Sequence, residues 1–229
     1  MSNANPRATR WIERPAPAPE QMDAADVDPA ALTKALQFIR RVNALLRYNA
    51  AVESALRSVG CGEGSTVLDV ATGSADLPQR LRRTLGCHVL GLDLHAETLA
   101  IAAAWTDVPL VRGDALRLPL ADASVDFVTA NLFLHHLDND TAVAVLRESA
   151  RVARKGVVVA DLLRNRRALA WITLFTACAS PMVRHDARIS VRQGWTMSEA
   201  ETLADHAGLA GARVERCFGH RFVLAWRKT

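Results

Sequence analysis

Acidic residues follow three apolar, β-type runs of the chain, and together they could serve one ligand. Asp69 lies at the end of the first run, Asp93 closes His88–Asp93, and Asp114 comes shortly after the third. Ligands of open α/β sheets lie across the carboxyl ends of the strands. A carboxylate such as Asp93 can accept hydrogen bonds from both hydroxyls of a ribose there, although it could also be a surface residue that begins the next helix. Dinucleotide-binding proteins share this feature, so Asp93 alone does not discriminate between ligands.

The segment after Asp69 is built of small residues, with Ala71, Gly73 and Ala75 at alternate positions. Small residues let the backbone come close to a ligand at this junction. A phosphate-binding turn would favour bare amides, whereas an acid before the turn suits a ligand with positive charge. The pattern therefore favours a cationic group beside Asp69.

The run 66–76 resembles the first motif of the class I S-adenosylmethionine-dependent methyltransferases, Asp-x-Gly-x-Gly-x-Gly. Gly73 matches it, and Ala71 and Ala75 stand where the family usually has glycine. Residues 60–227 are similar to the small-molecule type, which includes quinone-biosynthesis enzymes. The resemblance implies S-adenosylmethionine as cofactor, with the adenine amino group at Asp114 and the transferable methyl group near Asn131. The implied cofactor-binding residues are Asp69, Ala71, Gly73, Ala75, Asp93, Leu94, Asp114, Ala115 and Asn131.

Histidines supply the candidate catalytic groups. His135 and His136 follow the fourth β-type run, and imidazole titrates near neutral pH, so a general base is one interpretation. A ring that only caps or packs is the other. His185 lies beside Asp186 among arginines, where it could take a phenol proton, or the segment could be a solvated, charged turn. No spacing typical of metal ligands is present, so no metal is expected.

The apolar runs alternate with helical patterns, which predicts a doubly wound, Rossmann-like α/β sheet of mostly parallel strands. Strands are expected at 66–70, 88–92, 108–112, 124–130 and 155–161, and helices at 75–85, 96–105, 140–153 and 164–178. The runs 212–217 and 221–227 are too close to be parallel neighbours, so an antiparallel hairpin should complete a seven-stranded sheet. A helix is expected over 198–207, with a capping box from Ser198 to Glu201.

Two regions lie outside this alternation. Residues 1–59 form an N-terminal extension and helical arm, in which the first twenty residues are rich in Pro and Ala and are expected to be poorly ordered. Asp28 and Pro29 should begin a helix that breaks near 43–49. The core, 60–229, carries an insertion near 164–195 that should cover the substrate. Its helix is apolar around most of its circumference and needs a cover: the arm, a second copy in a homodimer, a membrane surface or an apolar ligand.

Composition narrows the function classes. The chain has 229 residues, a net charge of +4 and four widely spaced cysteines. That charge is too small to indicate nucleic-acid binding, and the cysteines form neither a zinc pattern nor a dense disulfide frame. The longest apolar run, 168–179, is too short to span a bilayer, and no signal peptide is apparent. We therefore expect a cytoplasmic protein without stable membrane insertion.

The expected function is methyl transfer to an oxygen or carbon of a small, mainly apolar acceptor of the phenol, quinone or polyketide type. A non-catalytic cofactor-binding protein is an alternative, because Ala71 and Ala75 depart from the family motif. An NAD-binding oxidoreductase is another, but the chain lacks Gly-x-Gly-x-x-Gly. A DNA-directed enzyme is not favoured, since Asn131 begins Asn-Leu-Phe-Leu rather than Asn-Pro-Pro-Tyr.

Overall fold

The computed structural model describes residues 15–24 and 26–228. The expectation of poor order over the first twenty residues therefore falls, for 1–14, outside the described residues. Within them, the strands form one seven-stranded sheet in the order β3-β2-β1-β4-β5-β7-β6. The strands are β1 (Thr66–Val70), β2 (His88–Asp93), β3 (Leu110–Arg112), β4 (Val125–Asn131), β5 (Ala153–Leu162), β6 (Arg213–Cys217) and β7 (Arg221–Arg227).

The sheet confirms the predicted topology. β1 to β5 pair in parallel, and β7 pairs antiparallel with both β5 and β6. Successive residues of β1 pack on opposite sides, since Val67 joins one buried apolar cluster and Leu68 the other. Both faces of the sheet are thus covered, as a doubly wound fold requires.

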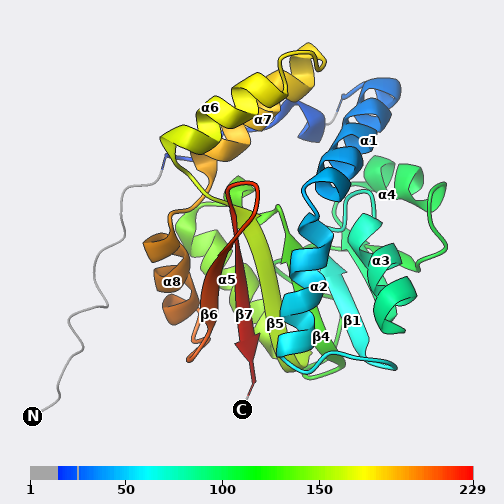
Figure 1. The fold of residues 1–229 in the computed structure, drawn as a ribbon. Coiled ribbons are helices and arrows are strands. Elements are labelled where there is room, and N and C mark those ends of the chain that lie inside the picture. Colours follow the sequence, from blue (N-terminus) through cyan, green and yellow to red (C-terminus); the bar gives the residue numbers. More distant parts are fainter. Residues whose placement is uncertain (1–14, 25, 229) are drawn as a thin grey trace, which may run out of the picture.

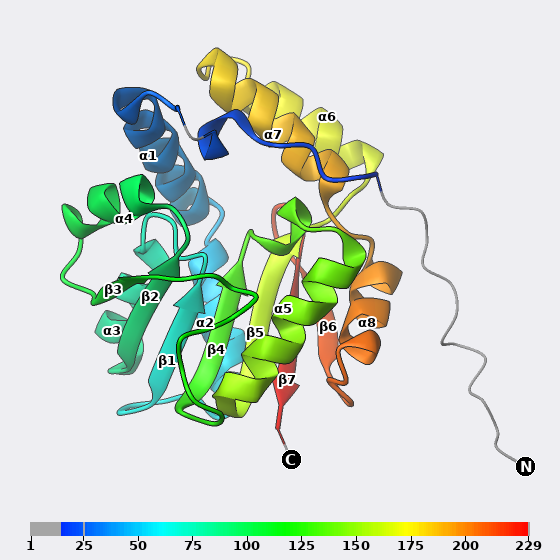
Figure 2. The ribbon, with the colours of Figure 1, turned by 180° about the vertical axis from the view of Figure 1, so that it is seen from behind.

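The helices form two side layers and a cap. Figure 1 shows α2 and α3 on one face of the sheet, and Figure 2 shows α5 and α8 on the other. α1, α6 and α7 lie beyond the carboxyl ends of the parallel strands in both views. The bounds are α1 (Pro29–Leu45), α2 (Tyr48–Ser58), α3 (Asp76–Leu85), α4 (Ala96–Ala103), α5 (Asn139–Val152), α6 (Arg166–Phe175), α7 (Pro181–Gln193) and α8 (Met197–His206), with short 3-10 turns η1 (Gln21–Asp23) and η2 (Leu134–His136).

The helical arm forms as its sequence predicts. The Asp28 carboxylate accepts a hydrogen bond from the Ala31 backbone N–H at 2.9 Å, and Pro29 occupies the first position of α1. The predicted break falls between α1 and α2, where Arg47 has a left-handed φ of 51°. The arm therefore bends over the sheet edge instead of continuing as one helix.

Two local expectations were wrong. The segment around Arg184 is not the charged turn given as one alternative but part of α7, which begins at Pro181 after the N-cap residue Ser180, whose side chain accepts from the Val183 N–H. The capping box at α8 uses Thr196 and Glu199 instead of Ser198 and Glu201, because the N-cap lies two residues earlier than predicted. None of the described helices is both long enough and apolar enough to cross a bilayer.

Candidate cofactor and acceptor cavity

A cavity of about 570 Å³ opens between the carboxyl ends of the parallel strands and the helical cap. Asp69, Asp93 and Asp114 all line it, so the sheet brings the three predicted carboxylates to one space. The other predicted cofactor residues that line it are Ala71, Gly73, Leu94, Ala115 and Asn131.

Asp69 lines this cavity and is 3% exposed. Its carboxylate accepts hydrogen bonds from the Thr72 hydroxyl (2.8 Å), the Thr129 hydroxyl (2.6 Å) and the Asn131 amide (3.1 Å). Burial raises the pKa of Asp69 to about 6 against the opposing effect of these donors. A cation placed beside this carboxylate would therefore gain a fixed and poorly hydrated partner.

The turn after β1 has the backbone shape for which the family uses glycine. Ala71, Gly73 and Ala75 all have a φ of +53°, the left-handed region that strains a residue with a Cβ. Ala71 and Gly73 line the cavity, and a Cβ placed on Gly73 would meet nothing within 4 Å. Ala75 is fully buried as the N-cap of α3 and is not among the lining residues. The alanine methyl groups thus leave the space above Gly73 open.

Asp93 and Asp114 border the same turn region from β2 and from the loop after β3. Asp93 is buried and accepts from the Gly73 N–H (2.9 Å) and the His95 N–H (3.1 Å). It therefore fixes the turn of β1 to the end of β2. Asp114 is exposed, and its Oδ1 accepts from the Leu116 N–H at 2.9 Å.

Asn131, at the end of β4, has an unused acceptor. Its amide nitrogen donates to Asp69, while its Oδ1 is buried and has no hydrogen-bond partner among the described residues. A buried carbonyl oxygen without a donor costs free energy, which a ligand N–H can recover. The fit between this atom, Asp69 and a ligand ammonium group supports a cofactor with an amino acid moiety.

His135 is held in an ionic chain and is not free to act as a base. Its Nδ1 lies 2.6 Å from Asp161 Oδ1, and its Nε2 lies 3.6 Å from Glu20 Oε1. Burial of the ring lowers its pKa, but the Asp161 and Glu20 carboxylates outweigh this and raise the pKa of His135 to about 10. A histidine protonated at neutral pH cannot take a proton from an acceptor, so the structure favours a positioning role over the predicted general base.

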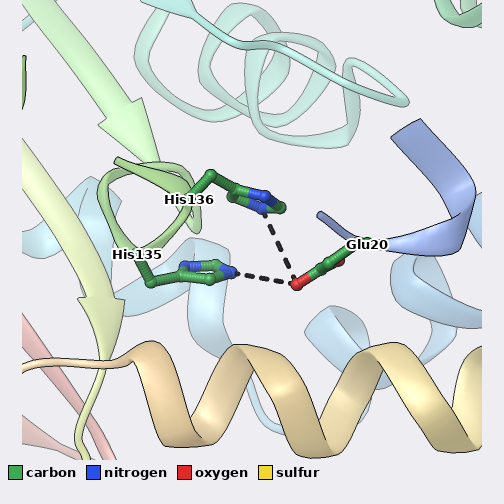
Figure 3. Close-up of side chains that lie close together, drawn as sticks. All are labelled: Glu20, His135 and His136. Atoms are coloured by element: carbon green, nitrogen blue, oxygen red, sulfur yellow. Dashed lines mark ion pairs between the residues drawn. The ribbon is translucent and has the colours of Figure 1, made fainter. Parts of the chain in front are cut away.

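Figure 3 shows the rings of both His135 and His136 pointing toward the Glu20 carboxylate. His136 Nε2 lies 4.0 Å from Glu20 Oε1, and its Nδ1 lies 3.3 Å from Asp23 Oδ2. The ligand atoms of Glu20, His135 and His136 all lie within 4.8 Å of one another, a grouping that could hold a metal ion. Glu20 Oε1 also accepts a hydrogen bond from the Ser190 hydroxyl. The Glu20 carboxylate therefore has partners among the described residues, the two histidines and Ser190, without a metal ion.

Residues 18–23, called the strap below, close this side of the cavity. Figure 2 shows the dark blue strap running alongside α7. Asp186 of α7 accepts from the backbone N–H groups of Gln21 (2.9 Å) and Met22 (3.1 Å), and Gln193 donates to the Ala18 carbonyl oxygen (3.0 Å). The sequence did not indicate Glu20 as a site residue, since it pairs with groups more than a hundred positions away.

The second predicted catalytic histidine, His185, lies elsewhere. It is exposed on α7 and is not among the residues that line the cavity, whereas its neighbour Asp186 is buried against the strap. One residue along a helix turns a side chain by about 100°, so the two cannot face the same space. The geometry therefore gives no support to proton transfer by His185.

Sequence reasoning also missed a buried arginine. Arg221, the first residue of β7, lines the cavity and is 5% exposed. Its Cζ lies 4.4 Å from the ring centre of Tyr48, a fully buried residue that also lines the cavity. In the sequence Arg221 is one of many arginines, and no local pattern marks it as buried.

Comparison with known proteins agrees with the fold. Residues 67–156 match the family model described as "Methyltransferase domain". Demethylmenaquinone methyltransferase of Mycobacterium tuberculosis is 40% identical over 109 residues, which are 48% of this chain and 44% of that protein. The relative with the same name in Mycolicibacterium paratuberculosis is 42% identical over 99 residues, 43% of this chain and 41% of that protein. The chain thus spans less than half the length of these curated relatives.

Solved structures share the fold over more of the chain. A SAM-dependent methyltransferase from Aquifex aeolicus superposes with a TM-score of 0.62 at 20% identity, covering 89% of this chain and 100% of that one. Human N-acetylserotonin methyltransferase in complex with SAM superposes with a TM-score of 0.67 at 17% identity, covering 88% and 56%. Residues 67–156 thus match a methyltransferase domain model, this part of the chain is similar to demethylmenaquinone methyltransferases, and the described chain shares the fold of the solved SAM-dependent methyltransferases.

Proposed function

We propose that this protein transfers the methyl group of S-adenosylmethionine to an oxygen or carbon of a small, mainly apolar acceptor of the phenol, quinone or polyketide type. The observation that carries the proposal is the meeting of Asp69, Asp93 and Asp114 in one cavity, beside the unused oxygen of Asn131. Demethylmenaquinone methyltransferases, the curated relatives, are named for a quinone acceptor, which favours this acceptor class.

Each residue of the cofactor half has a role that its surroundings suit. Asp69 and Asn131 Oδ1 would receive the cofactor ammonium group, and Asp93 would accept from the ribose hydroxyls. Asp114, with Ala115 beside it, would take the adenine edge. Gly73 leaves the backbone bare where the cofactor must pass closest.

The acceptor half lies beneath the helical cap and is apolar. Leu36 and Ile39 of α1, Ile172 of α6 and Val183 of α7 contribute to its wall. The strap closes one side through its ion pairs with His135 and His136. This arrangement suits an acceptor with a hydrophobic ring and would keep water from the reacting groups.

Chemistry at such a site needs little from the protein. The cofactor, held by Asp69, Asp93, Asp114 and Asn131, would supply a methyl group on a sulfonium sulfur, which would leave readily as a neutral thioether. The protein contributes alignment of the nucleophile behind the methyl group and exclusion of water. His135, held as a cation between Asp161 and Glu20, would fix the loop after β4 and the strap against each other.

The test has a binding step and a turnover step. Calorimetric titration with S-adenosylhomocysteine should give one binding site, and NADH should give none. With S-adenosylmethionine and a panel of reduced naphthoquinones and phenols, mass spectrometry should detect an acceptor gaining one methyl group. Absence of heat with both cofactor forms would contradict cofactor use. Binding without turnover on any acceptor of the panel would favour the non-catalytic alternative.

A further inference from the structure

The cavity contains a buried cation for which the described residues supply no counter-ion. Nε and Nη1 of Arg221 are buried without a hydrogen-bond partner, and Arg221 forms no ion pair with any described carboxylate. The hydroxyl of Tyr48, whose ring lies under the guanidinium, is likewise buried, and its O–H donates to no acceptor within the described part of the chain. Two neighbouring donors are therefore left unsatisfied in the same wall of the cavity.

The nearby acids are engaged elsewhere. Asp161 pairs with His135 at 2.6 Å. Asp76 accepts from the Asn49 amide (2.7 Å) and the Ser74 hydroxyl (2.9 Å). Both carboxylates act on Arg221 only as charges at a distance. Burying a charge without a close partner is costly, and removing water from a guanidinium is offset best by an oxyanion at hydrogen-bond distance.

The fold holds these two donors at the ligand end of the sheet. Arg221 pairs with Leu162 in the antiparallel β5–β7 register, and Leu162 ends β5. Tyr48 begins α2, which packs against β5 and β7. Figure 1 shows the start of β7 near the carboxyl end of β5, below the helical cap.

We propose that Arg221 and Tyr48 form an anion-binding site in the cavity, which takes a carboxylate or an ionised oxygen of a ligand. The planar guanidinium matches such a group with two parallel N–H donors, and the tyrosine O–H adds a third. The inference deepens the proposed function, because this anion has two sources: the methionine carboxylate of the cofactor, or an ionised oxygen on the acceptor.

Paired ligands distinguish these sources. S-adenosylhomocysteine carries the carboxylate, and 5′-methylthioadenosine is the same thioether nucleoside without the amino acid. For the acceptor, 2-naphthoate and the neutral 2-naphthamide have similar shapes and differ in charge. The variant is Arg221→Met, and the control is Arg227→Met, an exposed arginine on the same strand. Affinities come from calorimetry, with the fold of each variant checked by circular dichroism.

If the cofactor supplies the anion, Arg221→Met weakens the binding of S-adenosylhomocysteine by about 10- to 100-fold, the range of a hydrogen bond to a charged group. The affinity for 5′-methylthioadenosine stays unchanged. If the acceptor supplies it, the wild-type protein prefers 2-naphthoate to 2-naphthamide, and Arg221→Met abolishes that preference without affecting S-adenosylhomocysteine. Two affinity ratios thus carry the test: S-adenosylhomocysteine to 5′-methylthioadenosine, and 2-naphthoate to 2-naphthamide. Arg227→Met changes neither ratio.

Two results would overturn the anion site. One is an Arg221→Met protein that folds and keeps both ligand ratios, which would make the arginine purely structural. Should Arg221→Met fail to fold, Tyr48→Phe removes only the hydroxyl and must reduce one of the two affinity ratios several-fold. Unchanged ratios in Tyr48→Phe are the second result that would overturn the site. Loss of all nucleoside binding by the wild-type protein would contradict the proposed function instead, and the naphthoate comparison would still test the anion site.

Discussion

The buried carboxylate of Asp69 makes cofactor binding depend on pH in a predictable direction. Its pKa, about 6 in the folded chain, exceeds the ordinary value of 3.8 because burial disfavours the charged form. Only the ionised carboxylate attracts the ammonium group of the cofactor. Lowering the pH through 6 should therefore weaken binding by protonating Asp69.

The size of this effect follows from the pKa. At pH 7.5 nearly all of Asp69 is ionised, whereas at pH 5 roughly one molecule in ten is, so affinity for S-adenosylhomocysteine should fall about tenfold.

The raised pKa of Asp69 also makes the stability of the folded chain depend on pH. The folded chain without ligand holds the proton more tightly than the unfolded chain, so stability is highest below about pH 4. It falls by up to about 3 kcal/mol as the pH rises through 6.

Calorimetric titration at pH 5, 6 and 7.5 measures the affinity. Repeating it at pH 6 in two buffers with different ionisation enthalpies gives the protons released, which should be about one half for each ligand bound. Two controls separate Asp69 from other titrating groups. 5′-Methylthioadenosine lacks the ammonium group and should bind equally at all three pH values, and Asp69→Asn should bind S-adenosylhomocysteine weakly without pH dependence.

The reasoning would be refuted by an equal pH dependence for both ligands, because the change would then not involve the ammonium group. It would also be refuted if Asp69→Asn kept the wild-type pH profile.

The remaining predictions concern stability, measured by urea denaturation. Asp161→Asn should lower the free energy of unfolding by about 3–5 kcal/mol, because it leaves buried His135 without its carboxylate partner. A decrease no larger than that of the exposed control Asp140→Asn would contradict the ionic chain. Gly156→Ala should cost about 1–3 kcal/mol, since the new Cβ would lie 2.5 Å from the Trp226 carbonyl oxygen, and a neutral result would mean that β5 and β7 separate easily. Ala71→Gly should stabilise the chain by about 1 kcal/mol by relieving the left-handed strain at a φ of 53°, and a loss of stability would show that the Ala71 methyl group packs usefully.

The sheet was predictable because its signals are local. β1 falls at its predicted residues, and the short link between β6 and β7 left only an antiparallel pairing. The three carboxylates could also be placed, since the ends of parallel strands must share an edge. Their common cavity follows from topology and needs no knowledge of side-chain packing.

Other features depend on contacts between distant parts of the chain. A charged turn was one alternative for the segment near Arg184, yet α7 forms because it packs on α6 and holds the strap through Asp186. Glu20 lies in a Pro- and Ala-rich stretch with no helical or strand pattern, and its role depends on His135. Arg221 reads as an ordinary strand residue. The helix at Arg184, the ion pair of Glu20 and the burial of Arg221 all depend on tertiary packing, which the periodicity of the sequence does not predict.

The central claim is that carboxylates from successive strand ends hold one adenosyl ligand, and Asp93→Ala tests it most directly. Calorimetric titration with S-adenosylhomocysteine should show a loss of about 1–3 kcal/mol relative to the wild-type protein, from the missing ribose acceptor and the loosened Gly73 turn. The exposed control Asp140→Ala should bind as the wild-type protein does. Equal affinity of Asp93→Ala and the wild-type protein would contradict the account.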